Sequence, residues 1–181
     1  VQIRSNSFKH YQNGRVHGYQ VEIDASERAW SGGIYDEARR GWLVPMDNNK
    51  KGQEAFRKKG WNHYRVEAIG DTIKTWVNGV PAAHLIDDKT RSGFIGLQVH
   101  SIPEDSEEGK EVRWRNIRIL TDDLRKYSKE TPLAPVITKN RLTEQEVKDG
   151  WELLWDGETT AGWLGAKLDR FPDEGWIIEN G

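Results

Sequence analysis

The sequence predicts an all-β fold, an antiparallel β-sandwich. Short segments alternate apolar and polar side chains, as a strand with one buried face does, and residues 18–24 show this pattern most clearly. Glycine-rich turn signals separate these segments, and Asn78-Gly79 is the strongest hairpin signal in the chain. No convincing helical pattern occurs before Leu120.

Composition excludes several classes of function. The chain has 181 residues with 27 Lys plus Arg against 29 Asp plus Glu, so it lacks the basic excess that binds nucleic acid. It has no cysteine, which rules out a disulfide framework and a thiolate site in these residues. No apolar run approaches the roughly 18 residues that a membrane span needs. The nine tryptophans suit both a sandwich core and stacking on sugar rings.

The remaining elements follow in order along the chain. Strands are predicted over residues 1–4, 18–24, 61–69, 72–77, 90–100 and 112–120. The strands over 61–69 and 72–77 form a meander with a further strand after the Asn78-Gly79 turn. Residues 37–60 are predicted to be a long surface loop with one helical turn near 53–57. A charged, proline-rich linker follows over 122–139. Thr143 and Glu146 then fit a capping box that opens one short helix, after which a strand-and-turn pattern restarts.

The polar face of residues 18–24 is the leading candidate for a functional site. Gln20, Glu22 and Asp24 share it, although a solvated outer face would look the same. Arg4 is expected beside Glu22 on a neighbouring strand, either as an ion-pair partner or as a substrate contact. Trp42 is expected either to form a sugar platform or to pack the loop down.

His100 is the best histidine candidate for catalysis or metal binding, because Gln98 shares its face at the end of the predicted strand over 90–100. The alternative is a structural or exposed histidine. A divalent metal held by Glu22 or Asp24 together with His100 is a further hypothesis, since carboxylate plus imidazole is a common ligand set.

Motifs at both ends of the chain resemble one family. The runs GWELLWDGETTAGW and GWIIENG, over residues 150–163 and 175–181, are similar to the start of the 3-keto-disaccharide hydrolase domain, long described as a domain of unknown function. The runs GYQVEID, GGIYD, WNHYRV, WVNG, GFIGLQVH and VRWRNIRI resemble the later part of the same domain. The resemblance implies the back part of one domain over 1–120, a linker over 121–140 and the start of a second domain over 141–181. We therefore expect a fragment, or a chain completed by another segment.

The resemblance implies a concanavalin A-like lectin/glucanase jelly roll whose concave face binds carbohydrate, in periplasmic or extracellular proteins. The family acts on glycosides oxidised at C3, where the ketone acidifies the C2 proton so that a base can remove it and the C1 substituent can leave. The residues that fit these roles are Glu22 or Asp24 as base, His100 as the acid–base partner, Arg4 and Gln98 as oxygen contacts, and Tyr35 and Asp36 as pocket lining.

Two other functions remain open at this point. The run from Glu22 to Glu27 is similar to the E-[IL]-D-x-x-E signature of laminarinase-like retaining glycosidases. Retention needs carboxyls roughly 5 Å apart, whereas five residues of straight strand span about 16 Å. The other alternative is a lectin-like module that binds glycans through Trp42. Convergence of Glu22, Asp24, Arg4 and His100 in one pocket would favour catalysis.

Overall fold

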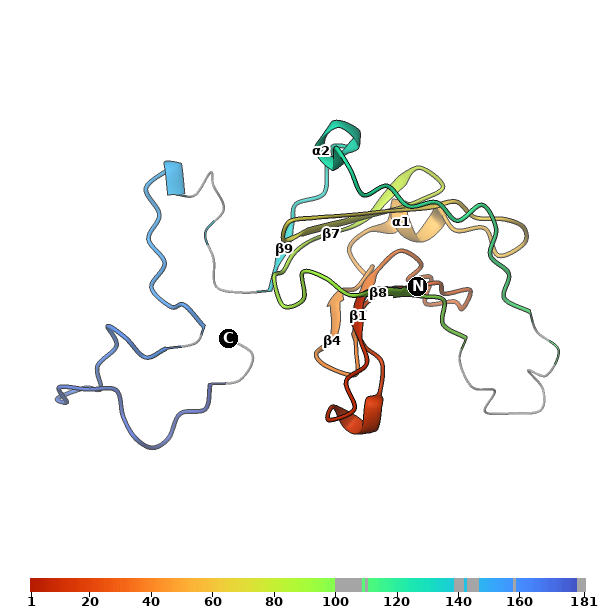
Figure 1. The fold of residues 1–181 in the computed structure, drawn as a ribbon. Helices are drawn as coiled ribbons and strands as arrows, with labels where there is room; N and C mark the ends of the chain where they lie inside the picture. The colour runs from red at the N-terminus through yellow and green to blue at the C-terminus, as the bar shows by residue number, and fades with distance from the viewer. Residues whose placement is uncertain (100–108, 110, 139–141, 143–146, 158, 179–181) are drawn as a thin grey trace. The chain divides into compact units, whose positions relative to one another are not determined.

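A computed structural model describes residues 1–99, 109, 111–138, 142, 147–157 and 159–178. The chain divides into two compact units, Val1–Val136 and Ile137–Gly181. The first unit contains nearly all of the regular structure (Figure 1).

Two antiparallel sheets form the first unit. The first sheet has the strand order β4-β3-β2-β1-β8, with β1 at Gln2–Asn6, β2 at His17–Val21, β3 at Ile34–Glu37, β4 at Gly41–Val44 and β8 at Phe94–Gly96. The second has the order β5-β6-β7-β9, with β5 at Tyr64–Ile69, β6 at Thr72–Val77, β7 at Val80–Ile86 and β9 at Val136–Ile137. A 3-10 turn at Gln12–Gly14 and the short helices α1 at Lys50–Glu54 and α2 at Leu124–Tyr127 complete the described elements.

The core lies between the two sheets, which confirms the predicted all-β sandwich. Ile3, Tyr19, Val21 and Ile34 from the first sheet pack in one cluster with apolar side chains of the second. The alternation in residues 18–24 has its physical cause here, because one face of β2 must be apolar to fill this space. The opposite face of the first sheet is therefore free for polar side chains.

The predicted meander is confirmed. Strand β5 pairs with β6, and β6 pairs with β7, all antiparallel. Val77 and Val80 face each other across the turn, and Asn78 and Gly79 have φ angles of 51° and 83°. Two consecutive left-handed residues are what a two-residue hairpin turn requires, and Asn-Gly supplies them at low cost.

The predicted strand over residues 112–120 is wrong. These residues form no strand, Asn116 has a φ of 53°, and the apolar side chains of Ile117 and Ile119 are 66% and 71% exposed. A strand needs a neighbour to pair its backbone groups, and no described strand borders this segment. Alternation of apolar and polar residues therefore identifies a segment that could form a strand. It does not show whether a neighbouring strand is present to pair with it.

The predicted loop over residues 37–60 is also partly wrong, because it contains strand β4. Trp42 thus stands on a strand of the first sheet. The single helical turn exists, but it starts at Lys50, where the side chain of Asn49 caps it by accepting a hydrogen bond from Gly52 N at 3.0 Å.

The charged segment after residue 121 packs on the second sheet. Lys129 N donates to the carboxylate of Glu67 on β5 at 3.0 Å, His84 Nδ1 lies 2.8 Å from the carbonyl oxygen of Leu133, and β9 joins the sheet beside β7. The stretch predicted as a linker is therefore attached to the first unit up to Val136. The domain boundaries at 120 and 140 stay predictions.

Over its described residues 147–157 and 159–178, the second unit is helical at 147–148 and then shows turns and bends, with no strand among these residues. The indole N–H of Trp163 donates to the carbonyl of Leu154 at 2.6 Å, and the Trp163 and Trp155 rings meet edge to face. The predicted helix opening at Thr143 and Glu146 lies outside the described residues. In the part of the chain that is described, no helix is long and apolar enough to cross a membrane.

Candidate functional site

One row of polar and aromatic side chains crosses the outer face of the first sheet. Trp42 on β4 pairs with Tyr35 on β3, Tyr35 pairs with Gln20 on β2, and Gln20 pairs with Gln2 on β1. Their sequence neighbours fill the core, so strand alternation turns this row to the opposite side. We call this surface, together with Glu22 and Gln98, the polar face.

A chain of hydrogen bonds runs through the polar face toward Glu22. Ser5 Oγ donates to Gln2 Oε1 at 2.9 Å, and Gln2 Nε2 donates to Gln20 Oε1 at 2.9 Å. Gln20 Nε2 in turn donates to Glu22 Oε2 at 2.8 Å. Gln2 and Gln20 are buried, at 3% and 6% exposure, so they form a fixed floor beside the partly exposed Glu22. A carboxylate fixed through one oxygen is oriented without being fully engaged.

Glu22 keeps one oxygen available. Its Oε1 has no hydrogen-bond partner among the described residues. This oxygen is free to accept a proton or a ligand hydroxyl, which the chemistry predicted for this residue requires.

Asp24 lies off the polar face and has a different role. Strand β2 ends at Val21, and Asp24 is only 7% exposed. Its Oδ1 accepts from Ser26 N at 2.9 Å, and its Oδ2 accepts from Arg28 Nε at 2.8 Å and from Trp30 N at 3.2 Å. Burial alone would raise the pKa of this carboxyl, but the hydrogen bonds from Ser26, Arg28 and Trp30 outweigh it and lower the pKa to about 2. Asp24 therefore holds the β2–β3 loop in shape and is a poor base.

An aromatic cluster borders the polar face at β4. The Trp42 ring lies 5.1 Å from the Tyr35 ring and 4.6 Å from the Trp30 ring, both edge to face. The guanidinium carbon of Arg28 lies 4.8 Å from the Trp30 ring centre and 4.9 Å from that of Trp42. Tyr35 and Trp42 thus lie on the polar face, beside two residues, Arg28 and Trp30, that the sequence analysis did not select.

Arg4 lies elsewhere, so the expectation that it sits beside Glu22 is wrong. Its Nη1 donates to the carbonyl oxygen of Gly70, in the β5–β6 turn of the second sheet, at 2.8 Å. The β1–β2 register shifts between Ile3 and Asn6, and Arg4 has a φ of 47°. Such an irregularity changes the face to which the following side chains point, which simple alternation does not predict.

Asp36 is buried on the opposite side of the first sheet. It is fully buried and accepts from Arg39 Nε at 2.7 Å and from Arg40 Nε at 2.6 Å. Arg40 also bonds to Asp87 at 2.7 Å, and Tyr19 donates to the same carboxylate. This buried ion network ties the β3–β4 turn to the end of β7, so Asp36 does not line the polar face.

Gln98 and His100 complete the predicted set. Gln98 Oε1 accepts from Gln2 Nε2 at 3.0 Å, which joins it to the floor of the polar face. His100 lies outside the described residues. The hypothesis that His100 binds a divalent metal together with Glu22 or Asp24 therefore stays a prediction. Within the described ranges, no three His, Cys, Asp or Glu side chains gather in an arrangement that could hold a metal ion.

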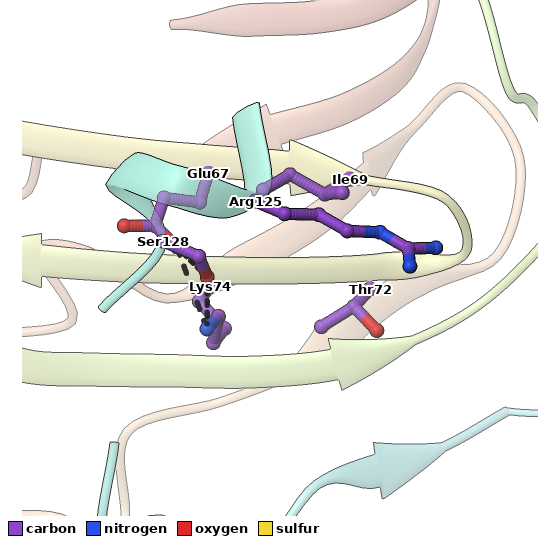
Figure 2. Close-up of a pocket in the computed structure, with 6 residues that line it drawn as sticks. All are labelled: Glu67, Ile69, Thr72, Lys74, Arg125 and Ser128. Atoms are coloured by element: carbon purple, nitrogen blue, oxygen red, sulfur yellow. Dashed lines mark hydrogen bonds and ion pairs between the residues drawn. The ribbon is translucent and has the colours of Figure 1, made fainter. Parts of the chain in front are cut away.

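A cavity of about 250 Å³ lies in another place, on the outer face of the second sheet under α2. Figure 2 shows its six lining residues, Glu67, Ile69, Thr72, Lys74, Arg125 and Ser128. Lys74 Nζ donates to Ser128 Oγ at 3.0 Å, and Ser128 Oγ donates to Glu67 Oε2 at 2.9 Å. Because these polar groups bond mainly to one another, we interpret the cavity as the seam that attaches the segment after residue 121 to the sheet.

The sequence could have indicated part of what was missed. Gln2 alternates with Val1 and Ile3 and so belongs to the same kind of polar face as Gln20. Arg28 and Trp30 carry no such signal, because only the fold of the β2–β3 loop brings them to Trp42.

An antiparallel sandwich that presents a carboxylate, amides and a tryptophan across one sheet face has the kinds of groups that bind sugar rings. A family comparison agrees. Residues 1–120 match the model of the 3-keto-alpha-glucoside-1,2-lyase-like domain, and the chain belongs to this family. No significant match was found among curated proteins. The predicted membership is thus confirmed, and with it a carbohydrate-active role.

Proposed function

We propose that the polar face binds a glycoside oxidised at C3 and that Glu22 is the base that starts its cleavage. The observation that carries this proposal is the state of the Glu22 carboxylate. Gln20 fixes one oxygen at 2.8 Å, and the other has no partner among the described residues. Membership of a family named for 3-keto-α-glucoside 1,2-lyase activity supports the same chemistry.

The reaction would run as an elimination across C1 and C2 of the sugar. The C3 ketone acidifies the C2 proton, Glu22 takes that proton, and the electron pair passes into the C2–C3 enolate. The enolate then re-forms the ketone as a C1–C2 double bond forms and the C1–oxygen bond breaks. The departing oxygen needs a proton, and His100 is our proposed acid for it. Later addition of water to the double bond would give net hydrolysis.

The buried amides would favour this reaction by their orientation. Gln2 and Gln20 are fixed by hydrogen bonds on both sides, so they need not reorganise as charge moves. Gln98 remains our proposed contact for a sugar oxygen, since it shares the polar face through Gln2. Arg4 and Asp36 have no part in this proposal, because their side chains lie away from the polar face.

The glycosidase alternative has less support. Glu27 is 96% exposed and pairs with Lys58, so it extends away from Glu22. A retaining pair would need the two carboxyls to face one substrate bond. One observation supports the lectin-like alternative: Trp30 and Trp42 are partly exposed. Measuring whether the protein turns over a substrate distinguishes this alternative from an enzyme.

The test is turnover of a 3-keto-disaccharide and of its unoxidised parent by the whole chain. Glu22→Gln keeps the shape and the hydrogen bond from Gln20 but cannot take a proton. We expect at least about a hundredfold loss of kcat in Glu22→Gln, since a positioned base typically contributes that much or more. Glu54→Gln, on the exposed face of α1, is the matched control and should turn over normally. His100→Ala should also lose turnover.

Other results of this assay would support a different function. Cleavage of the unoxidised parent would favour the glycosidase. Sugar binding without any turnover would leave the lectin-like module. Full activity of Glu22→Gln would refute the role of Glu22.

A further inference from the structure

We propose that Arg28, Trp30 and Trp42 form a second sugar subsite, which binds the ring that leaves with the C1 oxygen. The inference rests on the proposed function, because it takes the oxidised ring to lie over Glu22. It adds the part of the substrate that decides which glycosides the protein accepts.

The location follows from the sheet register. Gln20, which holds Glu22, pairs with Tyr35, and Tyr35 pairs with Trp42. Two strand spacings therefore separate Gln20 from Trp42, about 10 Å. That separation gives room for two linked sugar rings side by side, one over Glu22 and one over the Trp42 end.

The chemistry of the cluster suits a hydroxylated ring. Arg28 is 44% exposed, and only its Nε bonds to Asp24, so its terminal nitrogens have no partner among the described residues. Those nitrogens can donate to ring hydroxyls, while the partly exposed Trp30 and Trp42 offer apolar surface to the C–H groups. Charged donors beside flat apolar rings are a common way to bind sugars and other amphipathic rings.

The cluster is held rigidly, as a preformed subsite should be. Asp24 N donates to Ser31 Oγ at 2.8 Å, which closes the β2–β3 loop at its base. Thr75 Oγ1 donates to the carbonyl of Gly32 at 2.6 Å, which fixes the loop to β6. Gln53 Nε2 also donates to the carbonyl of Arg28 at 3.3 Å. Little conformational entropy would be lost when a ligand binds here.

The local charge indicates a neutral ring. Asp24 neutralises Arg28, and Lys58 neutralises Glu27, so Glu22 is the carboxylate of this loop with no side-chain cation paired to it among the described residues, and the amino group of Val1 interacts with its charge. An anionic sugar placed next to Glu22 would be repelled. We therefore assign a neutral pyranose or furanose ring to the subsite, not a uronic acid.

The experiment compares two 3-keto substrates, a disaccharide and the methyl glycoside of the same oxidised ring. Arg28→Lys keeps the charge but loses the planar donor pair and its stacking on tryptophan. We expect KM for the disaccharide to rise about tenfold more than KM for the methyl glycoside, with kcat for the disaccharide nearly constant, because a hydrogen bond to a charged group has about that effect. Arg91→Lys is the matched control, since Arg91 also pairs with an aspartate, Asp71, and lies outside the polar face.

The outcomes separate this proposal from the proposed function. Equal effects of Arg28→Lys on both substrates, or no effect on either, would overturn the subsite while leaving the role of Glu22 intact. If the wild type turns over neither substrate, the proposed function fails. The subsite is then tested by binding: the unoxidised disaccharide and methyl glucoside are titrated into the protein while the tryptophan indole NMR signals are recorded. Weaker disaccharide binding in Arg28→Lys would support the subsite, and unchanged or absent binding would overturn it. Tighter binding of a uronic acid disaccharide would overturn the assignment of a neutral ring.

Discussion

Replacing Asp24 with asparagine keeps the size of the side chain and removes its negative charge. The carboxylate accepts from Ser26 N, Arg28 Nε and Trp30 N, and these contacts hold the β2–β3 loop in place. We expect Asp24→Asn to lower the free energy of unfolding at pH 7. The substitution also distinguishes a loop anchor from a catalytic base.

The magnitude follows from the pKa of the carboxyl. Burial opposes ionisation, but hydrogen bonds from Ser26, Arg28 and Trp30 lower the pKa from 3.8 to about 2. That change corresponds to about 2 kcal/mol, and because Arg28 is 44% exposed, solvent screens part of it. We expect a loss of roughly 1–2 kcal/mol.

The pH dependence has a definite sign. A carboxyl with a lowered pKa in the folded state stabilises the protein above its ordinary pKa, and the stabilisation is lost as the pH falls through the folded-state value. The difference between wild type and Asp24→Asn should therefore be full above about pH 5 and shrink between pH 4 and pH 2.

Urea unfolding followed by tryptophan fluorescence at pH 7, 5, 4 and 3 measures this difference. Asp47→Asn, on an exposed aspartate, is the control and should change stability by less than about 0.5 kcal/mol. A difference that stays constant down to pH 3 would refute the electrostatic explanation. Unchanged stability together with lost turnover would show instead that Asp24 acts in catalysis.

Three further substitutions test the second sheet and its contacts with the rest of the first unit. Gly79→Ala should lower the free energy of unfolding, measured with urea, by about 1 kcal/mol, because the turn needs φ near 83°. A Cβ at this position meets no other atom within 4 Å, so the loss reflects backbone strain alone. Thr75→Val should lower stability by about 1–2 kcal/mol by leaving the carbonyl of Gly32 without its bond, and unchanged stability would show that this bond does not fix the loop. Glu67→Gln should speed amide hydrogen exchange at Lys129, whose N–H bonds to that carboxylate, and equal exchange rates would show that other contacts attach the segment.

The parts of the fold that could be predicted from sequence depend on neighbouring residues. The β5–β6–β7 meander follows from alternation and from one Asn-Gly turn, both of which act within a few residues. The same reasoning placed Gln20 and Glu22 on one face, since alternation fixes the face of a regular strand. Tyr35 is expected only from the family resemblance, and Trp42 is expected in a loop but lies on β4.

The errors occur where the local sequence pattern does not determine the structure. Arg4 lies within an irregularity in the β1–β2 register, and Asp24 lies beyond the end of β2, so counting alternate residues misplaces both. Residues 112–120 have the pattern of a strand, but pairing depends on a neighbour that the pattern does not contain. Arg28 reaches Trp42 only because Asp24 folds the intervening loop, a contact that requires the three-dimensional structure.

The row of amides beside Glu22 has a practical use. The hydroxyl of Ser5 and the side-chain N–H groups of Gln2 and Gln20 each donate toward the carboxylate, so the groups polarise one another in a single direction. Loss of charge at Glu22 should therefore shift the NMR signals of the Gln20 amide first and those of Gln2 less. The protein thus carries its own spectroscopic probe of the carboxylate, which needs no chromogenic substrate.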